Sequence, residues 1–280
     1  MATSAKVFIH SQYRHGHMAQ AELRILTYNI HKGFSAGNRH FVLPRLRDAL
    51  VEANADILLL QEVQGEHKQH ETTQLGWPDC SHAEYIAEGV WPHIAYGKNA
   101  LYNLGHHGNA ILSKHPIIRW ENINVSSLSW ASRSLLHGVI NLPEIEEELH
   151  IICIHLGLIN VERKQQIRIL SERIEAHVPD NAPLIIAGDF NDWSEKAEKH
   201  FSEQLNLQET HHTLHNKHAR TFPAWLPILK MDRVYYRKVK PISCERPRYN
   251  LWRRLSDHAP LIAKFEICNE VAEQVRKAKA

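Results

Sequence analysis

The stretch IIAGDFND, from Ile185 to Asp192, is a short apolar run that ends in carboxylate and amide side chains. We interpret the run as a buried strand, because short apolar runs closed by polar residues are typical of strands covered on both faces. Asp189 and Asn191 are two positions apart, and side chains at that spacing on an extended backbone point the same way. The stretch therefore predicts a core strand that presents two polar groups together at its end.

Other predicted strands begin or end at polar groups in the same way. The predicted strands span residues 23–30, 55–63, 108–117, 133–142, 149–158, 182–193, 230–239 and 259–267. The further polar groups near their ends are Asn29, Glu62, His155, Asp232, Asp257 and His258. Any one of them can simply end a strand, but together they predict a polar site if the strand ends meet at one edge.

Several carboxylates at one edge repel each other unless a cation or a proton compensates them. An oxygen-rich group without thiolates suits Mg²⁺, with Mn²⁺ as the alternative. Such an ion neutralises a phosphate, while a carboxylate or a histidine takes a proton from water. Arg133 adds a guanidinium fork that matches phosphate oxygens. The pattern therefore predicts metal-dependent phosphoester chemistry.

Two amphipathic helices, predicted over residues 43–54 and 160–178, alternate with these strands. The alternation predicts an α/β protein with mixed sheets and helices outside them. No repeat or flexible linker divides the chain. We therefore expect one domain over residues 23–268, with a flexible lead-in at 1–22 and a polar tail at 269–280.

The composition is that of an ordinary globular protein: 280 residues, 43% of them hydrophobic and 23% charged. No apolar run approaches the roughly 20 residues that span a bilayer, and no apolar signal core precedes residue 23. The four cysteines form no CxxC pair, which predicts reduced thiols. We expect a cytoplasmic protein, with peripheral contact at a membrane as the alternative. A net charge of +2 is too small to indicate a nucleic-acid binder.

Charge is concentrated between Arg237 and Arg254, where seven basic residues accompany one acid. Two interpretations stay equally open, a solvated loop and a patch that faces nucleic acid or an anionic membrane. The stretch TFPAWLPILK, residues 221–230, carries several apolar side chains. These could contact lipid or stack on a base, but its two prolines favour an irregular, buried approach to the next strand.

Histidines gather in HHTLHNKH, residues 211–218. On a helix, His211 and His215 would share one face, and such a pair can hold a transition metal. Because no third ligand is visible in the sequence, we favour a polar surface segment here.

Seven stretches, in order along the chain, resemble the motif set of the endonuclease/exonuclease/phosphatase family. They are TYNIHKG (27–33), ILLLQEV (57–63), HHGNAILS (106–113), ICIHLGL (152–158), IIAGDFND (185–192), KMDRVYY (230–236) and LSDHAPL (255–261). The motifs GDFN and SDH, found in this order, are specific to the family. The stretches HKGF and HHGNA most resemble those of small single-domain bacterial members. The family includes deoxyribonuclease-like nucleases, abasic-site endonucleases, neutral sphingomyelinases and inositol-polyphosphate 5-phosphatases. The resemblance implies a four-layer sandwich of two mixed β-sheets flanked by helices.

The resemblance also implies roles for individual side chains. The implied metal ligands are Glu62, Asn29 and Asp257; the implied catalytic residues are His155, Asp189, Asn191, Asp232 and His258; the weaker implied phosphate contacts are Arg133 and Asn109. Asp189 would orient or deprotonate the attacking water. His258 would act at the phosphoryl centre, with Asp232 fixing its tautomer. Asn191 and His155 would contact the phosphate and the leaving group.

One departure from the family pattern concerns the number of metal ions. Some members carry an acid two residues after the motif asparagine, and His31 occupies that place here. The difference favours a single ion. We expect a phosphodiesterase that acts on a lipid headgroup or another small diester. The alternatives are a Mg²⁺-dependent DNA or RNA nuclease and, less favoured, an inactive binding module.

Overall fold

The computed structural model describes residues 20–126, 132–142, 147–193, 196–247 and 250–268. The predicted tail and residues 1–19 of the predicted lead-in lie outside this part. The first strand begins at Gln20, so the last three residues of the predicted lead-in belong to it. Within the described ranges, no helix combines the length and the apolar character needed to cross a membrane.

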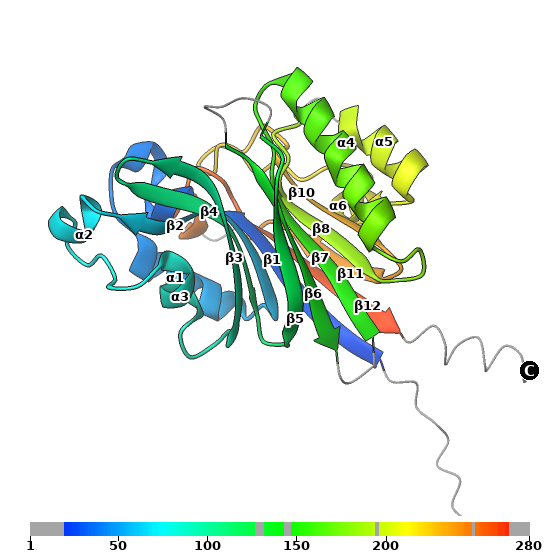
Figure 1. The fold of residues 1–280 in the computed structure, drawn as a ribbon, viewed down its shortest axis with the longest axis horizontal. Helices are drawn as coiled ribbons and strands as arrows, with labels where there is room; N and C mark the ends of the chain where they lie inside the picture. Colours follow the sequence, from blue (N-terminus) through cyan, green and yellow to red (C-terminus); the bar gives the residue numbers. More distant parts are fainter. Residues whose placement is uncertain (1–19, 127–131, 143–146, 194–195, 248–249, 269–280) are drawn as a thin grey trace, which may run out of the picture.

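The strands form two six-stranded sheets that face each other (Figure 1). The first sheet has the order β11 (Lys240–Glu245), β12 (Leu261–Cys268), β1 (Gln20–Asn29), β2 (Ile57–His67), β4 (Gly105–Ser113) and β3 (His93–Tyr102). The second has the order β5 (Ile117–Asn124), β6 (Ser134–Leu142), β7 (Glu147–His155), β8 (Leu184–Asp189), β10 (Asp232–Arg237) and β9 (Gln208–Glu209).

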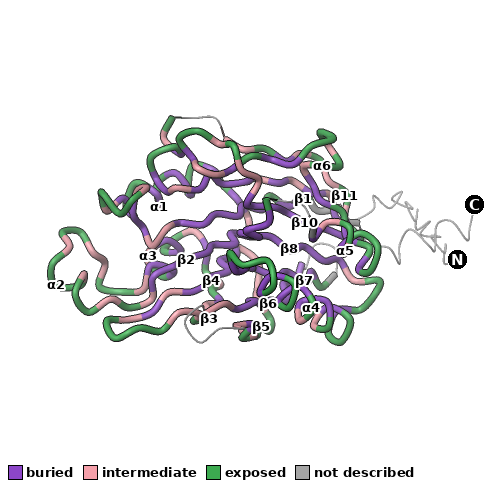
Figure 2. The backbone as a smooth tube through the Cα atoms, turned by 90° about the horizontal axis from the view of Figure 1, so that it is seen from above, coloured by how far each residue is buried: buried purple, intermediate pink, exposed green. Residues whose placement is uncertain are grey.

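Helices cover the outer face of each sheet. The first sheet is covered by α1 (Leu43–Ala53) and α3 (His82–Ala87), and the second by α4 (Asn160–His177) and α5 (Lys196–Leu205). Two further short helices, α2 (His70–Thr73) and α6 (Thr210–His215), lie in connections. One apolar cluster fills the space between the sheets and one lies under each helix layer. Buried backbone accordingly runs through the centre of Figure 2, with exposed segments outside. The predicted four-layer sandwich is confirmed.

Local sequence explains where the covering helices start and stop. Pro44 lies in the first turn of α1, where its missing N–H costs no helical bond. Asn54 ends that helix in the left-handed conformation, with φ of 48°. Ser81 and Glu84 form a reciprocal capping box at the start of α3. These signals set the ends of the two helices, and their apolar side chains pack on the sheet below.

Each sheet contains one parallel pair of strands, joined by a covering helix. In the first sheet β1 and β2 are parallel and α1 connects them; in the second, β7 and β8 are parallel and α4 connects them. The other pairs are antiparallel. Such β–α–β units bring the carboxyl ends of their two strands to the same edge. Polar residues that follow these strands therefore gather at that edge.

Four strands, β3, β5, β9 and β11, were not predicted from the sequence. All four lie at sheet edges. An edge strand is partly solvated, so it lacks a clear apolar pattern, and most positions of β5 are exposed or half-buried. The predicted strand over residues 108–117 was also too long, because β4 ends at Ser113 and Ile117 already begins β5.

The basic run from Arg237 to Arg254 is neither a simple loop nor one continuous patch. Arg237 is buried, and its guanidinium donates to main-chain carbonyls that include Pro179 at 3.1 Å. Lys240 lies in β11 and pairs with Glu266 at 3.2 Å. Arg253 and Arg254 are exposed, and Arg248 lies outside the described residues. The solvated-loop interpretation is therefore wrong for residues 240–245.

The preference for a buried stretch at residues 221–230 is wrong. Phe222 and Leu229 form an antiparallel bridge, and of the residues between them Ala224 is buried while the larger apolar side chains are exposed. Trp225 is 61% exposed, and Leu226 and Ile228 are more than half exposed. A short loop closed by one bridge has no sheet or helix to cover its apolar side chains.

Candidate active site

The candidate active site lies where the carboxyl ends of the two parallel pairs meet. In the second sheet, His155 pairs with Asp189, and Asp189 pairs with Asp232 on its other side. These three residues lie side by side on neighbouring strands, so their side chains share one face. In the first sheet, Asn29 ends β1, and Glu62 lies in the adjacent strand β2. Two segments 160 positions apart thus contribute to one polar cluster.

Glu62 is displaced from the regular strand by a bulge. The register between β2 and β4 shifts between Leu60 and Val63, and Glu62 has φ of 53°. A non-glycine residue in this left-handed region costs about 1–3 kcal/mol and typically persists at functional sites. The bulge turns the Glu62 carboxylate toward the cluster, where its Oε1 lies 3.4 Å from Asn29 Nδ2. Asn191 is also left-handed, with φ of 50°.

Asp189 is the centre of the cluster. Its Oδ2 lies 3.3 Å from Asn29 Nδ2, 3.5 Å from His155 Nε2 and 3.6 Å from His258 Nε2. Its Oδ1 accepts a hydrogen bond of 3.0 Å from the backbone N–H of Asn191. The carboxylate is buried, so these groups replace the water it would otherwise bind.

His258 links Asp189 to Asp232. Its Nδ1 lies 2.8 Å from Asp232 Oδ2, while its Nε2 faces Asp189. The Asp232 contact fixes the orientation of the ring, as an orienting carboxylate does for a catalytic imidazole. Burial disfavours charge on this imidazole, but Asp232 and Asp189 outweigh that effect and raise the pKa of His258 to about 10. Burial raises the pKa of Asp189 to about 7 against the opposing pull of His258.

The other side of the cluster holds an ionised carboxylate and a neutral imidazole. Burial alone would raise the pKa of Glu62, but His155, Lys32 and other neighbours outweigh it and lower that pKa to about 2. Burial, together with Arg133 nearby, holds the pKa of His155 well below its usual value. Glu62 is therefore a carboxylate at neutral pH, ready to bind a cation.

The donor atoms fit the divalent ion that the family implies. Mg²⁺ is usually bound by one or two carboxylates, with water and substrate oxygens in the remaining positions. Glu62 offers an ionised, half-buried carboxylate, and Asn29 Nδ2 lies between it and Asp189. Asn29 Oδ1, the atom of this side chain that could bind a cation, accepts the backbone N–H of His31 at 3.1 Å. Asp257, the third implied ligand, is contacted by the Ser256 hydroxyl at 3.2 Å. Asp232 Oδ1 is buried without a hydrogen-bond partner, so this oxygen can still accept a hydrogen bond from a ligand or a water molecule.

The implied phosphate contacts, Arg133 and Asn109, already make hydrogen bonds within the protein. Arg133 Nε and Asn191 Nδ2 both donate to the carbonyl of Leu156, at 3.3 and 2.8 Å. Asn109 is fully buried and donates to the Ser134 carbonyl at 3.0 Å, which leaves its Oδ1 without a partner. Arg133 thus lies near the strand that carries His155, while Asn109 anchors β4 to β6.

A cleft opens beside Glu62 on the side of the first sheet. It is lined by Lys32, Phe34, Asn38, Gln64, His67, His70, Tyr102 and His107. Lys32 Nζ lies 3.6 Å from Glu62 Oε2. Burial lowers the pKa of His107 to about 4, so this ring is neutral. Lys32 and His107 were not predicted as site residues from the sequence, although they lie inside the motifs TYNIHKG and HHGNAILS.

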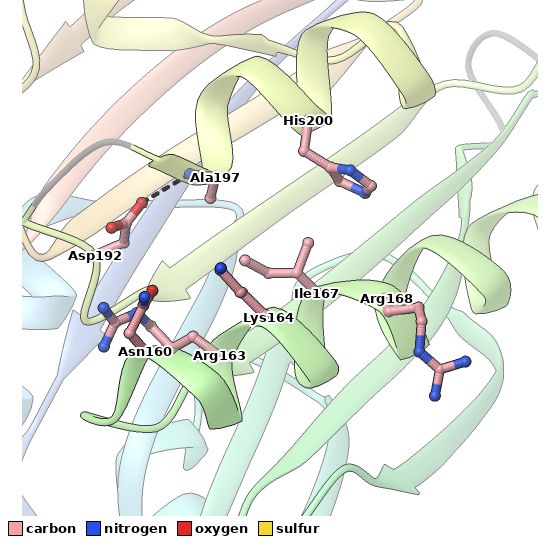
Figure 3. A pocket seen from close by; sticks show the side chains of 8 residues that line it. All are labelled: Asn160, Arg163, Lys164, Ile167, Arg168, Asp192, Ala197 and His200. Carbon is pink, nitrogen blue, oxygen red and sulfur yellow. Dashed lines mark hydrogen bonds between the residues drawn. The ribbon is translucent and has the colours of Figure 1, made fainter.

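A separate pocket lies between α4 and α5, outside the second sheet (Figure 3). Its lining consists of Asn160, Arg163, Lys164, Ile167, Arg168, Asp192, Ala197 and His200. Asp192 Oδ2 accepts a hydrogen bond from the backbone N–H of Ala197 in α5, at 3.0 Å. None of the lining residues belongs to the polar cluster, so this pocket is distinct from the candidate active site.

The chain belongs to the endonuclease/exonuclease/phosphatase family, whose model matches residues 26–258. Among its relatives is protein YbhP of Escherichia coli strain K12, which is 43% identical over 248 residues. That match covers 89% of this chain and 98% of YbhP. The family includes hydrolases that act on phosphoester bonds.

Solved structures of the same family share the fold at low sequence identity. One from Beutenbergia cavernae has a TM-score of 0.70 and 17% identity, and the match covers 88% of this chain and 72% of that one. The TDP2 protein of D. rerio, solved in complex with a single-strand DNA product, has a TM-score of 0.65 and 19% identity. That match covers 88% of this chain and 99% of that one.

Proposed function

We propose that this chain is a metal-dependent phosphodiesterase that hydrolyses a phospholipid-type diester at a membrane surface. The observation that carries the chemistry is the convergence of Glu62 and Asn29 from one sheet with the Asp189–His258–Asp232 chain from the other. The proposed cation site at Glu62 and Asn29 then lies next to the proton-accepting carboxylate of Asp189. Both groups accelerate hydrolysis of a phosphoester.

Each side chain has a part in the proposed reaction. Glu62 and Asn29 would hold Mg²⁺, which would stabilise the negative charge on the phosphoryl oxygens. Asp189 orients the attacking water and takes its proton, as its raised pKa allows. The oxygen of that water forms the new bond to phosphorus while the bond to the leaving oxygen breaks. His258, kept protonated by Asp232, binds a phosphoryl oxygen, and His155 contacts the leaving-group side.

The lipid part of the proposal rests on two exposed apolar segments at the carboxyl edge of the second sheet. One contains Trp225, Leu226 and Ile228 and precedes β10; its bridge residue Phe222 has its ring 4.9 Å from that of His258. The other contains Leu158, Ile159 and Val161 and begins three residues after His155. Exposed apolar groups that rim a polar site mark a ligand or membrane surface.

A nuclease is the second candidate. Exposed Trp225 and Trp193 could stack on bases, and the D. rerio TDP2 neighbour was solved with a single-strand DNA product. Two features favour lipid instead. Most of the exposed apolar side chains are aliphatic and cannot stack, and the net charge of +2 provides little attraction for a polyanion.

The test compares three substrates with Mg²⁺: anionic phospholipid vesicles, a soluble chromogenic diester and a single-stranded oligonucleotide. We expect Glu62→Gln to lower turnover of the preferred substrate by at least about 100-fold, because it removes the charge that binds the cation. Added EDTA should have the same effect. Full activity in either condition would contradict the metal-dependent mechanism.

A second pair of variants tests the lipid surface. Leu226→Asp should lower activity on vesicles by at least about tenfold and leave turnover of the soluble diester unchanged, because only membrane contact is lost. Ile118→Asp is the matched control. Ile118 is also exposed, but it lies at the end of β5 away from His155. Preferred cleavage of the oligonucleotide, unaffected by Leu226→Asp, would replace the lipid proposal with the nuclease.

A further inference from the structure

A second cluster of ligating side chains joins α5, α6 and the segment after α6. It consists of Glu198, His212 and His218, with Glu209 behind them. It is separate from the catalytic candidates, none of which it contains. We propose that Glu198, His212 and His218 form a binding site for a transition-metal ion of the Zn²⁺ type.

The geometry brings two imidazoles from different segments to one carboxylate. His212 Nδ1 lies 2.6 Å from Glu198 Oε1, and His218 Nε2 lies 2.7 Å from Glu198 Oε2. The three ligand atoms all lie within 4.8 Å of one another. Tetrahedral zinc with bonds of about 2.0–2.2 Å places its ligand atoms about 3.3 Å apart. Entry of the ion therefore requires the contacts of 2.6 and 2.7 Å between Glu198 and the two imidazoles to lengthen toward about 3.3 Å.

Glu209 provides the outer contact that metal-binding histidines usually have. Its Oε2 lies 3.0 Å from His218 Nδ1 and accepts the backbone N–H of His212 at 2.6 Å. A carboxylate on Nδ1 fixes the ring so that Nε2 points at the metal position. The side chain of His218 is 3% exposed and that of His212 is 48% exposed. The site thus has a rigid inner ligand and an outer ligand open to solvent.

The donor set selects a different ion from that expected at Glu62. Two imidazoles and one carboxylate suit Zn²⁺, Ni²⁺ or Cu²⁺, whereas Mg²⁺ prefers oxygen donors. Three protein ligands leave a fourth tetrahedral position for water. The chain therefore offers two sites of distinct chemistry, and occupancy of each can be measured with the other disabled.

The proposed ion would join α5 to the segment that leads into the exposed apolar loop. Thr221 follows His218 by three residues, and its hydroxyl accepts the backbone N–H of Asp232 at 3.2 Å. The Thr221 carbonyl accepts the backbone N–H of Ala259, next to His258. A metal at Glu198, His212 and His218 would therefore hold this segment in place and stabilise the fold.

The test uses the untagged full chain in a Glu62→Gln background, stripped of metal with a chelator. Zn²⁺ binding is measured by equilibrium dialysis, and Co²⁺ is added as a spectroscopic probe of tetrahedral coordination. We expect one tight equivalent of Zn²⁺, a tetrahedral Co²⁺ spectrum and a higher Tm with Zn²⁺. His212→Ala should abolish all three, and Glu209→Gln should weaken Zn²⁺ binding about 10–100-fold by removing the outer contact.

His211→Ala is the matched control, because His211 lies on the same helix but its Nδ1 contacts the Lys217 carbonyl instead of Glu198. It should retain the tight equivalent and the Co²⁺ spectrum. Circular dichroism establishes that each variant is folded. Absence of a tight equivalent in the folded parent would overturn the site and leave an ion-pair cluster only. Equal loss in His211→Ala and His212→Ala would also overturn the proposed ligand set.

Discussion

At the scale of single residues, the contact between Asp232 and His258 decides how the imidazole can act. The 2.8 Å contact is buried and holds the ring in one orientation. Asp232→Asn keeps the shape of the side chain but removes its charge. The substitution therefore lowers the pKa of His258 and weakens the hydrogen bond of the protonated ring to a phosphoryl oxygen. We expect kcat to fall about 10²–10³-fold, the usual cost of weakening one group that stabilises charge in the transition state.

The measurement is steady-state hydrolysis of the soluble diester by a variant whose circular dichroism and Tm match the parent. KM should change much less than kcat, because the lost interaction strengthens in the transition state. A folded Asp232→Asn variant with parental kcat would exclude the proposed role of the Asp232–His258 pair.

Two left-handed residues at the site illustrate how backbone conformation and chemistry are coupled. Glu62 and Asn191 both have positive φ, and both direct polar groups at the cluster, Glu62 from the bulge within β2 and Asn191 from just after β8. A regular strand would direct the Glu62 carboxylate elsewhere, since side chains alternate between faces. The sequence contains no marker for such a bulge at Glu62, because the residue is not glycine.

At the scale of secondary-structure elements, the close approach of β7 and β8 positions His155 beside Asp189. Gly188 has φ of 150°, and a Cβ there would collide with the backbone carbonyl of Ile154. We expect Gly188→Ala to lower the free energy of unfolding by about 1–3 kcal/mol and to reduce activity, because the two strands must separate. Urea denaturation and the diester assay measure the two effects.

Gly138→Ala provides the control for this prediction. A Cβ at Gly138 would lie 3.2 Å from the side-chain atom Ile111 Cδ1 and 3.5 Å from Ile151 Cγ2. These are flexible side-chain ends, so small rotations can relieve the contact. Gly138→Ala should therefore remain active and lose less stability. The opposite ranking of the two variants would refute the argument from strand approach.

The helix layer over the first sheet contains a buried histidine that makes stability depend on pH. His82 in α3 packs against the rings of Phe41 and Trp77, and burial, with His70 nearby, lowers its pKa to about 3. The unfolded chain binds a proton at about pH 6.5. Stability from this group is therefore complete above about pH 6.5 and is lost as the pH falls toward 3.

His82→Leu removes this pH-dependent contribution to stability and places an apolar side chain of similar size in the same site. Between pH 7.5 and pH 5, we expect the variant to lose about 2 kcal/mol less of its free energy of unfolding than the parent. Urea denaturation at the two pH values provides the comparison. Identical acid sensitivity in both proteins would show that His82 does not remain neutral in the folded state.

At the scale of the whole molecule, the small net charge predicts how strongly salt should weaken binding, and this distinguishes the two candidate substrates. A nuclease that neutralises 6–10 phosphates loses about 10³–10⁵ in affinity between 50 and 200 mM salt. With a net charge of +2, with Arg237 buried and with Lys240 paired to Glu266, we expect a fall in vesicle affinity of less than about tenfold over that range. A steep dependence in a salt titration of binding would favour nucleic acid.

The sequence predicted the elements whose residues are buried on both faces. The strands that contain Ile57–Leu60 and Ile185–Ala187 have continuous apolar runs, and both lie inside their sheets. Edge strands were missed because solvent removes the pattern. The apolar loop at Trp225 was misassigned for a related reason: apolar composition favours burial, but local sequence does not contain the surface that would cover it.

By itself, the amino-acid sequence determined the family, the alternation of strands and helices, and the polar residues that end the strands. These depend on local periodicity and short motifs, which neighbouring residues define. Only the tertiary structure decided which side chains meet, because Asn29 and Asp189, or Glu198 and His218, are brought together by sheet register and helix packing across long separations. It likewise decided that His212, rather than His211 or His215, faces Glu198, since the orientation of a helix depends on the surface it packs against.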